Sequence, residues 1–298
     1  MKVKLKKDII ENKNISNEAI FAYVGIILCY KHGLNAVLTN KNMINYYLTH
    51  DECMSRRFEE NLKNGLKELI SNKLIVCRKQ IGNDYYCDLL NIQLTDNEKF
   101  VFVDVEDIVK ITTMNHKNKL GILRLYLCMI STFVSKNHIT DIRDPDKYNN
   151  ILGMMSQKYL EEISGLSHYA TVEYLKTLEQ LNLIYVSRCS FVFKDKKGKV
   201  KSHNNIYGKY KDKALIDEFA SIRYSMYDDL HQIQSMNATN NARSLMQKYN
   251  CLRNDTSYDK DTVAAIYKYV CSYNEKYPKK AKDMKPFEKY GYVIKKTN

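Results

Sequence analysis

Glycine and proline are scarce in this chain, which has ten glycines, three prolines and no tryptophan among its 298 residues. All-β sandwiches and barrels need turn residues about every 8–12 positions, so this scarcity excludes them and favours a mainly helical fold. No run approaches the ~18 consecutive apolar residues that span a membrane. The basic start is followed by Asp8 and Glu11 rather than by the apolar core of a secretion signal. We therefore expect a cytoplasmic protein with no membrane span.

Patterns typical of catalysis and of metal binding are also missing. No G-x-x-x-x-G-K-[ST] phosphate-binding loop occurs, the eight cysteines include no C-x-x-C pair, and the seven histidines are isolated from one another. Carboxylates cluster at residues 104–107 and 141–146, but the first group precedes a helix and the second lies in a loop around Pro145. We expect no enzymatic activity, no cofactor and no metal site, with the cysteines as buried thiols in a reducing compartment.

The formal net charge of +13 is concentrated in two segments. Residues 188–213 contain nine Lys or Arg against two Asp, and residues 276–298 contain eight Lys against two acids, so these segments account for the whole excess. An AT-rich coding bias would raise the lysine count, but it does not explain why the excess lies in two places. Concentrated positive charge suits a polyphosphate, because neutralising backbone phosphates releases condensed counterions. The charge pattern therefore favours a nucleic-acid partner.

The same order of elements is expected twice along the chain: a helix, a short helix, a third helix and a β-hairpin. The first set covers residues 17–94. The second begins with a strand at residues 100–103 and an apolar, buried helix at 120–134, and it ends with a hairpin over residues 183–210. Three further helix-like segments follow before the basic tail: 214–234, 241–252 and 259–277.

Residues 159–184, YLEEISGLSHYATVEYLKTLEQLNLI, form the most informative passage. Gly165 ends one helix, Ser167 caps the next, and the small Ala170 allows the two helices to cross closely at this turn. The second helix is expected to bury a face made of leucines: Leu175, Leu178 and Leu181. Its opposite face carries the residues that are free to contact a ligand: His168, Tyr169, Val172, Glu173 and Lys176.

This passage resembles the helix-turn-helix of winged-helix DNA-binding proteins, whose pattern is roughly L-x-x-x-x-G-[LIV]-S-x-x-[TA]-[TV]-x-x-x-L-x-x-L-x-x-x-G-L-I. Every apolar position is met, and Asn182, which tolerates a left-handed backbone, replaces the commoner glycine. The resemblance implies that the second helix enters the major groove and that the hairpin tip is a wing contacting phosphates or the minor groove. The candidate DNA-binding residues of this module are Ser167, His168, Tyr169, Thr171, Val172, Lys176, Arg188, Lys194, Lys196, Lys197, Lys199 and Lys201.

The first module has the same expected shape but a different surface. Basic and acidic residues balance one for one over residues 51–88. Glu59 and Glu60 occupy positions where groove-facing residues would belong, and carboxylates facing phosphates are unfavourable. The module is therefore either a dimerisation unit or a weaker DNA-binding unit. In the second case its candidate DNA contacts are Arg56, Arg57 and Lys79.

Residues 205–210 extend the resemblance. They have the form N-x-Y-G-K-Y and precede an acidic-apolar helix, an arrangement similar to the replication initiators and replisome organisers of bacterial plasmids and phages. The tail motif Y-x-x-x-I-x-x-W of DnaD-type primosome proteins is absent, because the chain has no tryptophan. The resemblance implies a mainly α fold with small β-hairpin wings (α+β). Two tandem winged-helix domains, residues 1–98 and 99–213, would precede a helical C-terminal region, residues 214–298.

The function implied by this resemblance is sequence-specific binding of double-stranded DNA at the repeats of a replication origin. The protein would act as a homodimer and would contact host replication proteins through its C-terminal region. A transcriptional regulator would use the same module at a promoter. An interaction scaffold would use both winged helices for protein contacts, because winged helices also serve as dimerisation modules.

Overall fold

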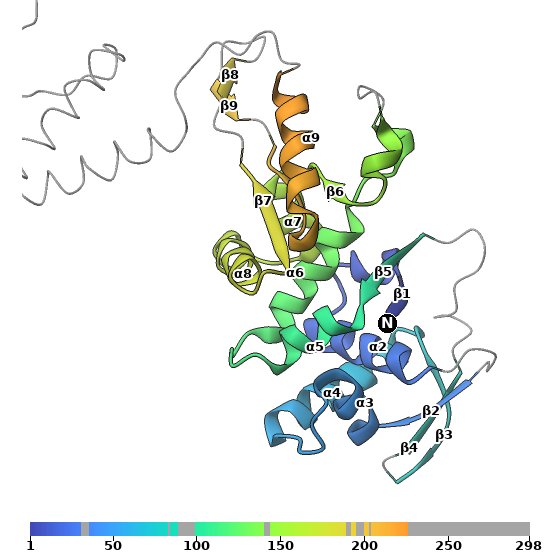
Figure 1. Ribbon diagram of the computed structural model, residues 1–298. Helices are drawn as coiled ribbons and strands as arrows, with labels where there is room; N and C mark the ends of the chain where they lie inside the picture. The colour runs from blue at the N-terminus through green and yellow to red at the C-terminus, as the bar shows by residue number, and fades with distance from the viewer. Residues whose placement is uncertain are drawn as a thin grey trace, which may run out of the picture. The chain divides into compact units, whose positions relative to one another are not determined.

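The structure, a computed structural model, describes residues 1–30, 36–82, 84–88, 99–139, 144–188, 192–194, 200–202 and 204–225. Its fold is mixed α/β with small antiparallel sheets (Figure 1), in agreement with the α+β class. The chain divides into a main unit, Met1–Arg188 with Asn204–Met226, and a second unit, Cys189–His203 with Tyr227–Asn298. Of the described elements, strands β8 (Val192–Lys194) and β9 (Val200–Ser202) belong to the second unit and the others to the main unit.

The first expected set of elements is present in the main unit. Its helices begin after Ser16, Asn40 and Ser55, whose side chains accept hydrogen bonds from the backbone N–H three positions later. Gly82 lies in the hairpin turn with a φ of 59°, a conformation that suits glycine. The elements are α2 (Asn17–Cys29), β2 (Ala36–Asn40), α3 (Lys41–Thr49), α4 (Arg56–Ser71), β3 (Val76–Ile81) and β4 (Asp84–Asp88).

The second set follows the same succession. The apolar helix α6 is buried from Gly121 to Ser131, as its composition predicts. The segment around Pro145 was expected to be an exposed loop, but Tyr148 is buried there and packs edge-on against Phe219 at 5.0 Å between ring centroids. The elements are α6 (Lys119–Ser131), η1 (Lys136–His138), η2 (Pro145–Tyr148), β6 (Leu152–Gly153), α7 (Gln157–Ser164), α8 (His168–Gln180), β7 (Ile184–Ser187) and β10 (Ile206–Lys209).

The two sets build sheets of identical strand order. In each sheet the last strand of the hairpin is central. It pairs on one side with the first hairpin strand and on the other with a short strand that lies between the first two helices of the set. The resulting orders are β2-β4-β3 and β6-β10-β7, and all pairs are antiparallel. Strands β2 and β6 were not expected from the sequence. They extend the predicted repetition of elements to the topology of the sheets.

An N-terminal ribbon was also not expected. Strand β1 (Lys2–Lys6) pairs antiparallel with β5 (Phe100–Asp104), with Lys4 opposite Phe102 and Leu5 opposite Val101. Two short helices follow these strands: α1 (Lys7–Ile10) and α5 (Val105–Thr113). The sequence predicts the strand at residues 100–103, but its partner begins with a lysine-rich run that local patterns do not mark as a strand.

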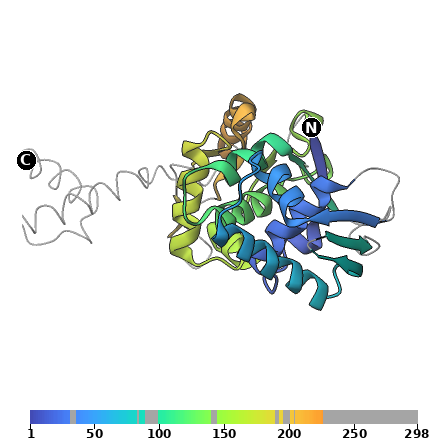
Figure 2. The same ribbon diagram turned by 90° about the horizontal axis from the view of Figure 1, so that it is seen from below.

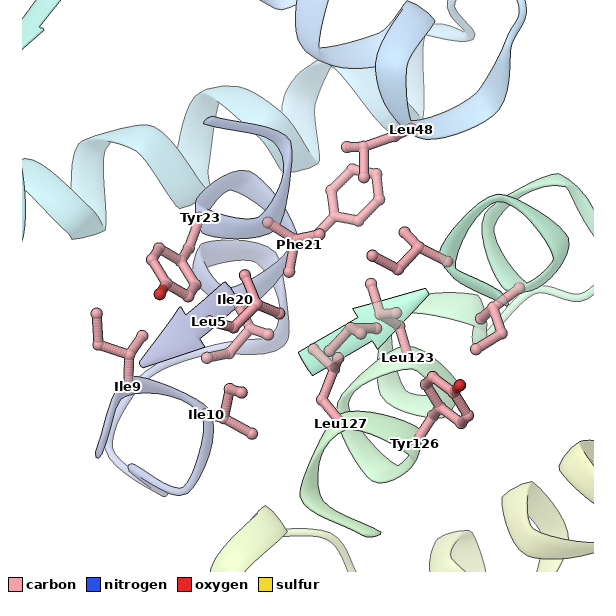
Figure 3. Packing of buried hydrophobic residues seen from close by; sticks show 14 of the residues in the cluster. Leu5, Ile9, Ile10, Ile20, Phe21, Tyr23, Leu48, Leu123, Tyr126 and Leu127 are labelled. Atoms are coloured by element: carbon pink, nitrogen blue, oxygen red, sulfur yellow. The ribbon is translucent and has the colours of Figure 1, made fainter. Parts of the chain in front are cut away.

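The hydrophobic core is continuous between the two sets of elements. Helix α6 contacts α2 and α5 as well as α7 and α8, and Figures 1 and 2 show it between α8 and the helices of the first set. Figure 3 shows Leu5, Ile20 and Phe21 facing Leu123 and Leu127 of α6 within one buried cluster. This packing fixes the elements of both sets relative to each other, because interlocked buried side chains resist displacement.

Helix α9 (Lys213–Ser225), preceded by η3 (Tyr210–Asp212), is the described part of the expected C-terminal helical region. It packs on β10 through Ile216 and Phe219, which form a second buried cluster with Ile206. The expected helices at 241–252 and 259–277 and the basic tail lie outside the described residues.

Candidate nucleic-acid interface

The turn between α7 and α8 has the local geometry that the sequence predicts. Gly165 ends α7 in the left-handed conformation with a φ of 67°, and the Ser167 hydroxyl accepts a hydrogen bond from the Ala170 N–H at 3.3 Å. After α8, Asn182 is left-handed with a φ of 53°. These residues fix where α8 begins and where the chain turns into β7.

One side of α8 is buried against α6. Tyr174 and Leu178 lie on this side, and a Cβ built on Gly121 of α6 would meet the Tyr174 ring at 2.6 Å. Leu175 and Leu181, expected with Leu178 on the buried face, are half-buried. A side chain at position 121 would therefore have to displace the Tyr174 ring.

Thr171 corrects the set of candidate contact residues. Its side chain is fully buried, and its hydroxyl donates a hydrogen bond to the Ser167 carbonyl oxygen at 3.0 Å. Position 171 lies three residues before Tyr174 and seven before Leu178, so all three share the face that α8 turns to the core. The buried threonine is not available to a ligand.

The other predicted residues of α8 are accessible. The side chain of His168 is 75% exposed and Tyr169 is 78% exposed. Lys176 is exposed and makes no ion pair with any residue that the structure describes, and Val172 is half-buried. His168 Nδ1 lies 2.7 Å from Glu161 Oε1 and 3.2 Å from Gln157 Nε2, so α7 holds the imidazole at the start of α8.

The helix pair itself is not positively charged. Helices α7 and α8 together carry two lysines and four glutamates. Arg188, a candidate DNA contact, donates hydrogen bonds to both carboxylate oxygens of Glu179 at 2.8 and 2.6 Å. These hydrogen bonds raise the pKa of Arg188, so its charge is offset where it lies. Helices α7 and α8 alone therefore carry a net formal charge of −2.

The candidate wing residues belong to the segment between β7 and β10. Strands β7 and β10 pair with Ser187 opposite Ile206, so the connecting residues leave and re-enter the same end of one sheet. Within it β8 and β9 form a hairpin, with Lys194 opposite Val200 and Lys201 opposite Phe193. The remaining candidate wing residues lie outside the described residues: Lys196, Lys197 and Lys199.

Two lysines that contribute to the basic count of residues 188–213 are engaged within the protein. Lys209 Nζ donates hydrogen bonds to carboxylate oxygens of Asp104 and Asp107, and Lys211 lies 3.7 Å from Asp104. Burial raises the pKa of Asp104, but the Lys209 hydrogen bond and the nearby lysine charges outweigh burial and lower it. We call Asp104, Asp107 and Lys209 the carboxylate latch. It joins the start of α5 to the end of β10.

The structure brings Arg57 of the first module close to α8. A cleft of about 270 Å³ is lined by Arg57 and Phe58 of α4, by residues 116–121 and by Tyr174 of α8. His116 Nε2 lies 3.9 Å from Glu173 Oε1 of α8. Arg56 and Arg57 are exposed and make no ion pair with any described residue. The cleft has four basic lining residues, and three of them were not predicted from the sequence: His116, Lys117 and Lys119.

Lys119 shows that these basic residues are not equivalent. Its Nζ donates a hydrogen bond to the Thr112 carbonyl oxygen at 2.7 Å and lies 5.2 Å from the centre of the Phe58 ring. Burial lowers the pKa of Lys119. Lys117 and Arg57 are exposed, so they are the cations of the cleft that remain available to an anion. The polar run Asn115 to Lys119 before a buried helix was the only signal for this feature.

Comparisons with protein-family models, with curated proteins and with solved structures found no match. Within the described ranges, no group of three or more His, Cys, Asp or Glu side chains has a geometry that could hold a metal ion. None of the described helices combines the length and the apolar character needed to cross a bilayer.

Proposed function

We propose that this chain is a sequence-specific double-stranded DNA-binding protein in which α8 enters the major groove. In this proposal both sets of elements are winged helices and residues 188–204 form the wing of the second. The observation that carries it is the exposed face of α8, because His168, Tyr169 and Lys176 project from a helix whose opposite face is locked against α6. The repeated strand order of the two sheets supports the winged-helix assignment.

The chemistry of the exposed face suits base and backbone contacts. The first residues of a recognition helix are those that reach base edges, and His168 and Tyr169 occupy that place on α8. An imidazole offers a donor and an acceptor, and a phenol offers a hydroxyl together with a flat apolar ring. Lys176 lies two turns further along, where an ammonium group can contact a base edge or a phosphate.

Binding strength in this proposal comes from the lysines of residues 194–201. The helix pair has a surplus of glutamates, so it contributes selectivity rather than general attraction to DNA. The wing segment carries five lysines against one aspartate. Arg57 of the first module and Lys117, just before α6, line the cleft next to α8 and add positive charge there. Phosphate contacts give affinity, and base contacts give selectivity.

The resemblance of residues 205–210 supports a replication initiator that binds origin repeats, acts as a homodimer and contacts host replication proteins through its C-terminal region. A transcriptional regulator would use the same face of α8 at a promoter. The surplus of glutamates on α7 and α8 favours the third function, an interaction scaffold, and the binding experiment must separate it from the first two.

The experiment begins by selecting target duplexes from a random pool with the full chain, followed by gel-shift titration against target and random duplex. Lys196→Glu with Lys197→Glu should weaken binding to both duplexes and reduce the dependence of log K on log salt by about 2, because each phosphate contact contributes about 0.9. His168→Ala with Tyr169→Ala and Lys176→Ala should instead remove the preference for the target, since each base contact contributes about 1–3 kcal/mol.

Lys158→Ala is the matched control for both variants. Its side chain lies on α7 and is 84% exposed, and its Nζ lies 3.9 Å from Glu162 Oε1. Its removal therefore tests the loss of one surface lysine near α8. It should leave both affinity and preference nearly unchanged. If the pool yields no preferred sequence and the wild type binds neither duplex, the chain is not a DNA-binding protein. Full duplex affinity in the wing variant would refute the role assigned to the lysines of residues 194–201.

A further inference from the structure

The ribbon formed by β1 and β5 has one face that core packing does not explain. Its inner face is apolar, and Leu5, Val101 and Val103 are buried there. The outer face presents two phenylalanines instead of the polar residues expected toward water: Phe100 is 41% exposed and Phe102 is 50% exposed. Adjacent outward-pointing aromatic rings on a small ribbon indicate a binding surface.

The two rings lie together and are accompanied by positive charge. Their centroids are 5.1 Å apart with an interplanar angle of 88°, and Lys4 Nζ lies 4.8 Å from the centre of Phe100 and 5.5 Å from that of Phe102. Lys2, two positions before Lys4 on β1, lies on the same face and is also exposed. The nearest acid on this face, Asp104, is already engaged by the carboxylate latch. The face therefore combines aromatic rings with a net positive charge.

We propose that this outer face, defined by Lys2, Lys4, Phe100 and Phe102, binds single-stranded nucleic acid. Unpaired bases would stack on the two rings, and the lysines would contact the phosphates. Stacking on aromatic side chains tolerates any sequence because every base has a π-face, and a positively charged track follows the backbone. Complementary charge favours a polyanion over an apolar protein segment, and duplex DNA does not offer open base faces to a flat ribbon.

This surface is separate from the proposed duplex-binding face. Figures 1 and 2 show the ribbon and α8 on different sides of α6. The inference therefore goes beyond the proposed function and does not depend on it. Variants of the ribbon leave α8 and residues 188–204 unchanged, so failure of one proposal can be distinguished from failure of the other.

The absence of tryptophan from the chain permits a direct spectroscopic test. Phe102→Trp introduces a single indole on the ribbon, and we expect its fluorescence to be quenched when a mixed-sequence DNA single strand is added. Tyr46→Trp places the same reporter on α3, at a position that is 49% exposed in the wild type. The Tyr46 ring lies beside the rings of Tyr47 and His50, but no described lysine lies over it, in contrast to Lys4 over Phe102. That control should therefore show no quenching if binding needs the lysines of the ribbon as well as its rings.

Affinity measurements separate stacking from other contacts. Phe100→Ala with Phe102→Ala should weaken single-strand binding at least about tenfold, whereas Phe100→Tyr with Phe102→Tyr should retain it. Duplex binding and thermal unfolding of the alanine variant should match those of the wild type, because both side chains are exposed and the buried face of the ribbon is untouched.

Several results would overturn the proposal. Phe100→Leu with Phe102→Leu should lose affinity as the alanine variant does; if it retains full affinity, the face is an apolar protein-docking surface and not a stacking surface. A change in the sedimentation of the protein without any change in single-strand affinity would assign the face to contact between copies of the chain. An unquenched indole at position 102 under saturating single strand would also refute it.

Discussion

Gly208 lies where β6 and β10 pair below α9, and its replacement by alanine is expected to destabilise the protein. A Cβ at this position would lie 2.5 Å from the Ile151 carbonyl oxygen and 2.8 Å from Ile216 Cδ1. Favourable contacts between carbon atoms require about 3.5–4.0 Å. The Ile216 side chain can move, but the Ile151 carbonyl belongs to the backbone just before β6. The strand itself must therefore shift.

The expected magnitude follows from two opposing effects. Overpacking of a well-packed site costs about 1–3 kcal/mol, and a Gly→Ala change recovers about 0.4–1 kcal/mol by restricting the unfolded chain. The net loss should be about 1–2 kcal/mol, which lowers Tm by about 2–8 °C for a unit of this size. Thermal unfolding followed by circular dichroism measures this shift.

A second variant identifies the atom responsible. Ile216→Val removes Cδ1, so adding it to Gly208→Ala relieves the contact with the side chain but leaves the contact with the Ile151 carbonyl oxygen. The double variant should therefore remain less stable than Ile216→Val alone by most of the amount that Gly208→Ala costs in the wild type. If Gly208→Ala is as stable as the wild type, or if Ile216→Val restores its stability completely, the reasoning from backbone contact is wrong.

Two further predictions concern charged side chains. Asp104→Asn removes a carboxylate of the latch and should cost about 1–3 kcal/mol of folding free energy at neutral pH. Because the pKa of Asp104 is lowered in the folded state, the wild type loses this advantage as pH falls through that lowered pKa. The difference in Tm between wild type and variant should therefore shrink below about pH 3.9. A pH-independent difference would contradict this assignment. Glu179→Gln should weaken the hydrogen bonds to Arg188 and tighten duplex binding in gel shifts, and the slope of log K against log salt should increase by about 1. The matched control Glu162→Gln removes the same charge without affecting Arg188 and should change that slope less. Equal effects of the two variants would refute a specific role of the Arg188–Glu179 pair.

The N-x-Y-G-K-Y residues, which carry the resemblance to replication proteins, have structural roles in this fold. The Tyr207 hydroxyl lies 2.6 Å from the Thr132 hydroxyl in the core, Gly208 allows the approach of Ile151, and Lys209 belongs to the carboxylate latch. The motif therefore secures β10 between β6, β7 and α9. A motif of this kind is evidence for the architecture of the sheet rather than for a direct contact with DNA.

Local patterns were sufficient to locate most helices and hairpins. Ser167 marks the start of α8 because a cap needs only its own helix, and Gly165 and Asn182 mark turns because few residues adopt a left-handed backbone. Strand β1 could not be found in this way. Its partner is almost a hundred positions away, and only the pairing with β5 makes a lysine-rich run into a strand with one buried face.

The exposed candidates on α8 followed from helical periodicity, which is a property of the sequence alone. The tertiary structure decided which charged side chains are paired and which residues at the edge of the exposed face are buried. Thr171 is buried because α6 covers its side of the helix, Arg188 is engaged because Glu179 lies within hydrogen-bonding distance, and Lys209 is offset by acids that lie far away in the chain. Counting charges along a sequence treats every lysine and arginine as free, and only the folded arrangement shows which of them are already paired.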